Sequence, residues 1–194
     1  MNSVQTLPEG YEVIEKMDLQ KDKKTMLLVN GLAVVIFVVM SVIMNIICPL
    51  PEWFMSPDRG SDIGNLLIIS LGYIAYIVLH EFTHGAAMKY FGGTKVDFGF
   101  TGMYAFAGSK IDYFARKPYI VISLAPAVVW GIVFTVLMIL FPGYLWSLYF
   151  LQMGNMAGAA GDFYVTWKML HMPDDVYVQD TGVSMTVYSR TKVH

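Results

Sequence analysis

Long stretches without a charged residue constrain this chain more than any other feature. Residues 26–48 and 118–141 each run for more than 20 positions without Asp, Glu, Lys or Arg. A helix needs roughly 20 apolar residues to cross about 30 Å of hydrocarbon. Hydrophobic residues make up 56% of the chain and charged residues only 14%, which is too few to cover the surface of an ordinary soluble domain. The sequence therefore predicts an integral membrane protein.

Proline, glycine and charged residues separate the apolar stretches from one another. The predicted spans are 26–48, about 64–91, 118–141 and about 144–170. We expect an all-α integral membrane protein with four transmembrane helices, whose membrane domain covers residues 26–170. A polar leader, 1–25, precedes this domain, and a polar tail, 171–194, follows it. Alternating residues in the tail, at Val176–Val178 and Val183–Val187, allow short strands there.

A short β-hairpin is predicted between the second and third spans, over residues 94–107. Val96, Phe98 and Phe100 alternate with polar or glycine residues, and a Thr-Gly turn separates them from a second apolar run. An exposed edge of this hairpin can add a substrate strand, which would make Phe98 and Phe100 candidate substrate-binding residues. The alternative is a hairpin that only connects two helices.

The distribution of Lys and Arg predicts the orientation of the chain in the membrane. Basic residues concentrate in the leader, in the loop 92–117 and in the tail, whereas the other two loops contain only Arg59. Because cytoplasmic loops carry the excess of Lys and Arg, we expect a multi-pass protein of the cell membrane with both termini cytoplasmic. A net charge of −2 gives no sign of nucleic-acid binding. The single cysteine, Cys48, excludes a metal cluster built from thiolates of one chain.

The second span contains an HExxH motif, formed by His80, Glu81 and His84 with two residues between. Histidines at positions i and i+4 lie one turn apart on one helix face, so both can bind one metal ion. The glutamate between them can take a proton from water at the metal. Ionisable residues inside a span are costly and usually functional, which favours this interpretation over a polar cluster that only packs helices.

A catalytic zinc site takes three protein ligands and keeps one position open, so a third ligand is needed. His84 lies about 10 Å from the cytoplasmic end of its span, and Asp162 about 12 Å from the end of its own, at 1.5 Å per residue. The similar depth makes Asp162 the best candidate. His171 would lie about 13 Å lower on the same helix. His194 is the last residue and is expected to be mobile.

These residues carry a resemblance to a known family. The HEFTHG motif, together with the run Asn-Met-Ala-Gly-Ala-Ala-Gly-Asp at 155–162, resembles the small zincin-peptidase membrane proteins of bacteria. Those proteins are similar to the site-2 protease clan of intramembrane metalloproteases. The resemblance implies that zinc is held by His80, His84 and Asp162 and that Glu81 activates water. It also implies that Asn155 holds the substrate strand.

The leading hypothesis for the function is a zinc metalloprotease that cleaves a peptide or membrane-protein substrate at or within the lipid bilayer. A catalytically silent membrane scaffold or regulator that keeps zinc for structure is the alternative, and the presence of Glu81 argues against it. A zinc hydrolase acting on lipid-linked substrates is a third possibility. The sequence leaves the substrate, the partner proteins and the oligomeric state open.

Overall fold

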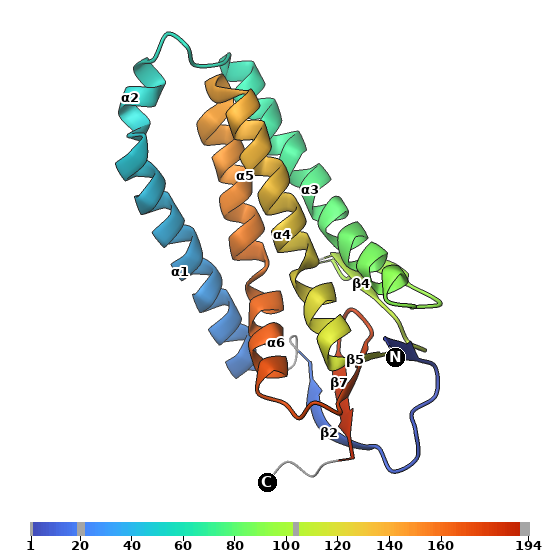
Figure 1. Cartoon of the computed structure of the whole chain (residues 1–194). Helices are drawn as coiled ribbons and strands as arrows, with labels where there is room; N and C mark the ends of the chain where they lie inside the picture. The colour runs from blue at the N-terminus through green and yellow to red at the C-terminus, as the bar shows by residue number, and fades with distance from the viewer. Residues whose placement is uncertain (1, 19–21, 103–104, 191–194) are drawn as a thin grey trace. The chain divides into compact units, whose positions relative to one another are not determined.

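The computed structural model describes residues 2–18, 22–102 and 105–190 (Figure 1). The chain divides into two compact units, and each unit is built from segments that are far apart in the sequence. The first comprises Met1–Leu28, Glu81–Ala125 and Gly161–His194, and the second comprises Val29–His80 and Pro126–Ala160. The motif histidines therefore lie where one long helix passes from the second unit to the first.

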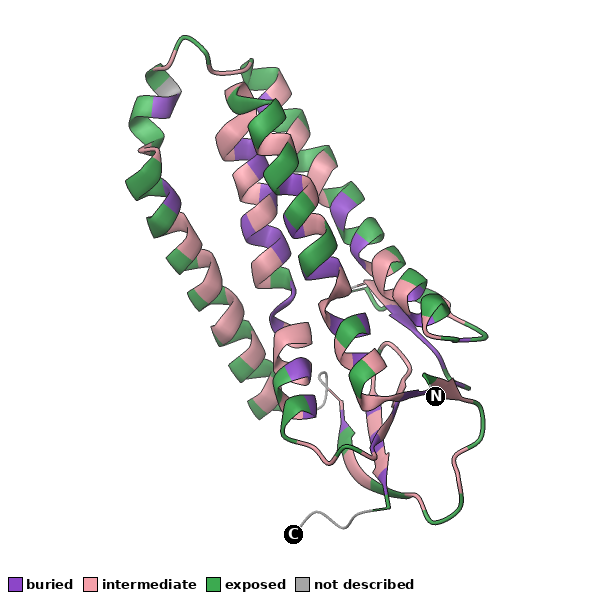
Figure 2. Cartoon of the chain, viewed as in Figure 1, coloured by how far each residue is buried: buried purple, intermediate pink, exposed green. Residues whose placement is uncertain are grey.

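Three helices are long and apolar enough to cross a membrane, by length and composition. They are α1 (Lys23–Ile47), α3 (Asp62–Tyr90) and α4 (Arg116–Leu140). These helices match the first three predicted spans. A short helix, α2 (Leu50–Met55), starts directly after Pro49. Figure 2 shows exposed and intermediate residues along most of α1, whose most apolar window has no buried residue. Apolar surface on this scale marks a membrane or protein contact.

The prediction of a fourth transmembrane helix over residues 144–170 is wrong. This segment forms two shorter helices, α5 (Leu145–Gly158) and α6 (Ala160–Leu170), and neither is among the three helices long enough to cross a membrane. Ala159, between them, has φ −77° and ψ 8°, which lies outside the α-helical region. Each glycine costs about 1 kcal/mol relative to alanine inside a helix, so the glycine-rich run weakens the helix at this point.

The prediction of an all-α protein is also wrong, because the described residues include a five-stranded antiparallel sheet. Its strand order is β1-β5-β6-β7-β2. The strands are β1 (Ser3–Val4), β5 (Tyr113–Ala115), β6 (Tyr177–Asp180), β7 (Met185–Ser189) and β2 (Glu12–Met17). The leader and the tail, which we expected to be separate polar segments, thus pair directly through β2 and β7. The two alternating runs that allow strands in the tail overlap β6 and β7. The strands β1, β2 and β5 were not predicted, because strands of two to six residues give no clear alternation in the sequence.

The sheet provides half of the ten buried residues that form the core cluster of the first unit. Phe114, Val178 and Val187 are fully buried in it, and Met88 of α3 and Met169 of α6 belong to the same apolar cluster. Burial of β7 alternates from residue to residue, as expected for a strand with one face on a core. The second unit has its own smaller cluster, which contains Tyr76, Phe134 and Leu151. The cluster of the first unit, which includes Met88, therefore holds the end of α3 that carries His84.

The predicted hairpin is confirmed, with strands β3 (Asp97–Phe100) and β4 (Ala105–Gly108) paired antiparallel. Asp112 anchors the base of this hairpin and is only 1% exposed. Its carboxylate accepts hydrogen bonds from Thr94 N, Lys95 N and Ser109 Oγ at 2.7–3.2 Å. Burial by itself would raise the pKa of Asp112, but these hydrogen bonds outweigh burial and hold the pKa below its usual range. Asp112 is therefore a structural carboxylate.

Candidate functional site

The two motif histidines sit near the C-terminal end of α3, a helix of 29 residues. Its first turn carries Asp62 and its last turn carries Lys89, so both charges complement the helix dipole. The helix is unbroken from His80 to His84, and its own geometry therefore places both imidazoles on one face, one turn apart. His80 is 9% exposed, and the side chain of His84 is 12% exposed. Glu81 is half-buried beside them.

Asp162, in the first turn of α6, lies beside the motif. Its Oδ1 is 3.4 Å from Nε2 of His84. Two ligands placed about 2.0–2.1 Å from a tetrahedral zinc ion are separated by about 3.3–3.4 Å, so this distance matches one edge of a zinc tetrahedron. One ligand atom from each of His80, His84 and Asp162 lies within 4.8 Å of the other two. Two imidazoles and a carboxylate are a common donor set of catalytic zinc sites, and these residues fit the metal that the sequence predicts.

A backbone carbonyl fixes the ring of His84. Nδ1 of His84 lies 3.0 Å from the carbonyl oxygen of Ile122 in α4. A carbonyl can only accept, so Nδ1 carries a hydrogen and Nε2 is the ring nitrogen left to bind a metal. This carbonyl is available because Pro126, four residues later, has no N–H to bond to it within the helix. The proline thus creates a hydrogen-bond acceptor for the histidine.

Side chains of the second unit hold the ring of His80 at its Nδ1 atom. Its Nδ1 lies 2.8 Å from the hydroxyl of Tyr76, one turn earlier on α3. The same hydroxyl donates to Oδ1 of Asn155 at 3.0 Å. Asn155 has no exposed surface, and its amide also donates to the carbonyl of Ala127 at 3.1 Å. The amide that we expected to hold a substrate strand is therefore occupied inside the protein.

The hairpin contacts the motif through Phe98. The ring of Phe98 stacks on Phe82, a residue inside the HExxH motif, with ring centroids 5.2 Å apart and planes 14° apart. Gly85 follows the motif, and a side chain at this position would collide with the Phe98 ring. Phe98 is still 48% exposed, and Phe100 is 70% exposed. The structure thus places one of the two predicted substrate-binding residues against the motif and leaves the other on the surface.

His171, the remaining histidine among the described residues, does not join this cluster. His171 is exposed, and its Nδ1 lies 2.8 Å from the carbonyl of Trp167 in the preceding turn. His194 lies outside the described residues. Among the described histidines, cysteines and acidic residues, the group that can hold a metal is His80, His84 and Asp162.

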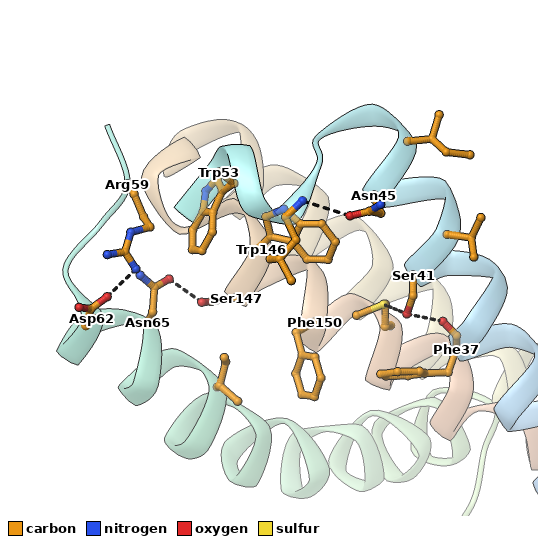
Figure 3. A pocket seen from close by; sticks show the side chains of 15 residues that line it. Phe37, Ser41, Asn45, Trp53, Arg59, Asp62, Asn65, Trp146, Ser147 and Phe150 are labelled. Atoms are coloured by element: carbon orange, nitrogen blue, oxygen red, sulfur yellow. Dashed lines mark hydrogen bonds and ion pairs between the residues drawn. The ribbon is translucent and has the colours of Figure 1, made fainter. Parts of the chain in front are cut away.

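A separate cavity of about 740 Å³ lies in the second unit, among α1, α2, α3 and α5 (Figure 3). Polar side chains around it bond to the protein itself. Ser147 donates to Asn65 at 2.5 Å, Arg59 binds Asp62 at 2.5 Å, and Trp146 donates to a backbone carbonyl at 3.1 Å. Its walls are mainly apolar, and no residue of the HExxH motif lines it. The cavity therefore has no part in the candidate metal site.

The sequence analysis did not identify the two groups that contact the histidine rings, the Tyr76 hydroxyl and the Ile122 carbonyl. The position of Tyr76, four residues before His80, is a signal because residues at i and i+4 are neighbours on a helix. Pro126 is the signal for Ile122, because a proline frees the carbonyl four residues earlier.

Comparison with known proteins identifies a family. A family model described as "Putative zincin peptidase" matches residues 73–177, which is more than half of the chain. The matched region includes the motif on α3, the hairpin, α4 and Asp162 on α6. No curated protein and no solved structure matches the chain.

Proposed function

Because the chain belongs to the Putative zincin peptidase family, we propose that it is a zinc metalloprotease that cleaves peptide bonds at or within a membrane. The observation that carries this proposal is the convergence of His80, His84 and Asp162, whose ligand atoms lie within 4.8 Å of one another. A structural zinc site fills all four positions with protein ligands, whereas three donors leave one position for the reaction. The three apolar helices support an action at the membrane.

Each residue of the site has a distinct role in this proposal. His80, His84 and Asp162 hold the metal through two imidazole nitrogens and a carboxylate oxygen. When bound, zinc supplies a Lewis acid and makes water acidic enough to act as a nucleophile near neutral pH. Glu81 takes the proton from the attacking water and passes it to the leaving amine. Glu81 suits this role because it is half-buried beside both histidines on the same helix.

The hairpin is the proposed binding surface for an extended substrate. Among the described residues β3 pairs only with β4, so the other edge of β3 is available to a further strand. The far end of β4 is tied to the β6–β7 turn, because Ser109 N donates to the Asp180 carbonyl at 2.6 Å. Strand addition at β3 would place the backbone of the substrate next to Phe98, which stacks on the motif residue Phe82.

Replacing Phe100 by alanine tests the substrate surface. Phe100 is 70% exposed on β3, so its ring is free to contact a side chain of an added strand. Such cross-strand contacts contribute up to about 1 kcal/mol, so we expect KM to rise about fivefold with little change in kcat. Val13→Ala, an exposed position on β2 of the other sheet, serves as the control and should leave KM unchanged. An unchanged KM in Phe100→Ala would argue for a hairpin that only connects helices.

The orientation that we propose for the chain has both termini in the cytoplasm. Because α1, α3 and α4 alone would leave the tail on the opposite side from the leader, this proposal has the two shorter helices α5 and α6 together return the chain. Strands from the leader, from the loop before α4 and from the tail share one sheet, so these three segments lie on one side of a membrane. They are also the segments that hold nearly all the Lys and Arg outside the apolar stretches, which favours the cytoplasmic side.

A reporter that is active only in the cytoplasm, fused after His194, is expected to be active, and a reporter active only outside the cytoplasm is expected to be silent. A fusion in the loop at Asp58 should give the opposite pattern, because that loop carries only one basic residue, Arg59. An external C-terminus would move the proposed active site to the opposite face of the membrane.

Metal removal tests the function itself. The purified protein, reconstituted in vesicles with a library of fluorogenic apolar peptides, is expected to contain about one zinc ion per chain and to cleave some of the peptides. Dialysis against a chelator should remove both the metal and the cleavage, and added Zn²⁺ should restore both. Bound zinc without cleavage of any peptide would support the silent scaffold instead.

A further inference from the structure

We propose that Tyr76 and Asn155 are positioning residues that set the tautomer of His80 and so prepare its Nε2 for the metal. This inference rests on the proposed zinc site, and it assigns a task to two buried side chains that touch neither metal nor substrate. The residues involved, Tyr76, His80, Asn155 and Ala127, all lie in the second unit. Tyr76 is 5% exposed and Asn155 is completely buried, so water cannot substitute freely for their hydrogen bonds.

The amide of Asn155 has a defined orientation. Its Nδ2 donates to the carbonyl of Ala127 at 3.1 Å and lies 3.4 Å from Oε1 of Gln152. Both neighbours are acceptors, so the NH₂ group must face them, and Oδ1 must face the other way. Oδ1 is then the acceptor for the hydroxyl of Tyr76, at 3.0 Å.

The direction in which the Tyr76 hydroxyl donates its single hydrogen determines which ring nitrogen of His80 carries a hydrogen. A tyrosine hydroxyl donates once, and here it donates to Asn155. The contact of 2.8 Å between this hydroxyl and Nδ1 of His80 must therefore have Nδ1–H as its donor. A neutral imidazole with its hydrogen on Nδ1 has its lone pair on Nε2. In a neutral His80 ring, the relay from Ala127 through Asn155 and Tyr76 thus keeps the hydrogen on Nδ1 and the lone pair on Nε2, the nitrogen proposed to bind the metal.

Both motif histidines reach the same tautomer by different means. Nδ1 of His84 donates to the Ile122 carbonyl, which cannot act as a donor and so admits one tautomer only. The partner of His80 is a hydroxyl, which can donate or accept, and its direction depends on Asn155. Asn155 therefore controls the tautomer of His80 without contacting its ring.

This dependence predicts an unusual order of effects. Tyr76→Phe removes the partner of Nδ1–H and should weaken zinc binding about 10–100-fold, the usual range for groups that orient a metal-ligating histidine. Asn155→Leu removes the acceptor of the Tyr76 hydroxyl, which then turns its hydrogen toward Nδ1 of His80. The ring hydrogen moves to Nε2, and zinc must displace it, so we expect Asn155→Leu to bind zinc more weakly than Tyr76→Phe. Adding Tyr76→Phe to Asn155→Leu should restore zinc affinity to the level of Tyr76→Phe alone.

The experiment measures two quantities in detergent-solubilised full-length protein. Nitrogen-15 spectra of labelled histidine report which ring nitrogen of His80 carries the hydrogen in metal-free protein, and competition with a chelating dye reports the zinc Kd. Neither readout depends on cleavage, so a protein without peptidase activity still tests the relay. Tyr73→Phe is the matched control, because Tyr73 lies on the same helix with its ring centroid 6.0 Å from that of Tyr76.

The expected result is Nδ1–H in the wild type, Nε2–H in Asn155→Leu, and a double variant that binds zinc more tightly than Asn155→Leu. A role in packing alone predicts that the double variant is the weakest of the three, because damage from two structural changes accumulates. That outcome would overturn the proposal, as would wild-type zinc affinity in Tyr76→Phe. If Asn155→Leu does not fold, the tautomer and the affinity of Tyr76→Phe against Tyr73→Phe decide the question.

Discussion

Glu81→Gln is expected to abolish peptide-bond cleavage while the protein keeps its zinc and its fold. Glutamine has the shape of glutamate but cannot accept a proton at neutral pH, and loss of a general base costs on the order of 10²–10⁴ in rate. The three metal donors, His80, His84 and Asp162, are unchanged in this variant. The measurement is cleavage of the fluorogenic peptides in vesicles, together with the zinc content of the same sample.

Glu52→Gln is the matched control, because it makes the same chemical change at an exposed position of α2. It should retain both zinc and cleavage. If Glu81→Gln instead loses its zinc, Glu81 is a ligand and the assignment of roles within the motif is wrong. If it keeps full cleavage, the proton is taken elsewhere and the proposed mechanism fails.

The part of the site that was predictable from the sequence depends on local geometry. His80 and His84 are four residues apart on one helix, so their proximity follows from helical periodicity alone. Asp162 lies 78 residues after His84 in the chain. It was predicted to lie near His84 because a rise of 1.5 Å per residue places both residues at a similar depth in their apolar segments. The 3.4 Å separation of His84 and Asp162 agrees with that argument, although the helix expected to carry Asp162 is broken just before it.

The parts that escaped prediction depend on contacts between distant segments. The sheet joins β1 and β2 near the N-terminus to β5 in the middle and to β6 and β7 near the C-terminus. Each strand is short, and its pairing is set by partners that no local pattern identifies. The support of His80 is a similar case, because the orientation of Tyr76 depends on Asn155, 79 residues away. A hydrogen-bond direction of this kind has no counterpart in residue spacing.

Asp162→Ala is expected to strip zinc from the purified protein. Two imidazoles from one helix turn leave a catalytic site one ligand short, and they provide no negative charge to offset Zn²⁺. The loss of a direct ligand should weaken binding by more than about 100-fold, the upper end for groups that only orient ligands. Cleavage should disappear together with the metal. Zinc content by elemental analysis and the zinc Kd by dye competition are the measurements.

The choice of control decides what this experiment proves. Asp112→Ala is a poor control, because Asp112 anchors the base of the hairpin through backbone and side-chain hydrogen bonds, and its removal leaves buried donors without an acceptor. Asp97→Ala is better, since Asp97 is partly exposed on β3 and forms an ion pair with Lys95, at 3.7 Å. It should keep its zinc. If Asp162→Ala binds zinc as tightly as Asp97→Ala, then the 3.4 Å contact between His84 and Asp162 is only an ion pair, and the third ligand is another group.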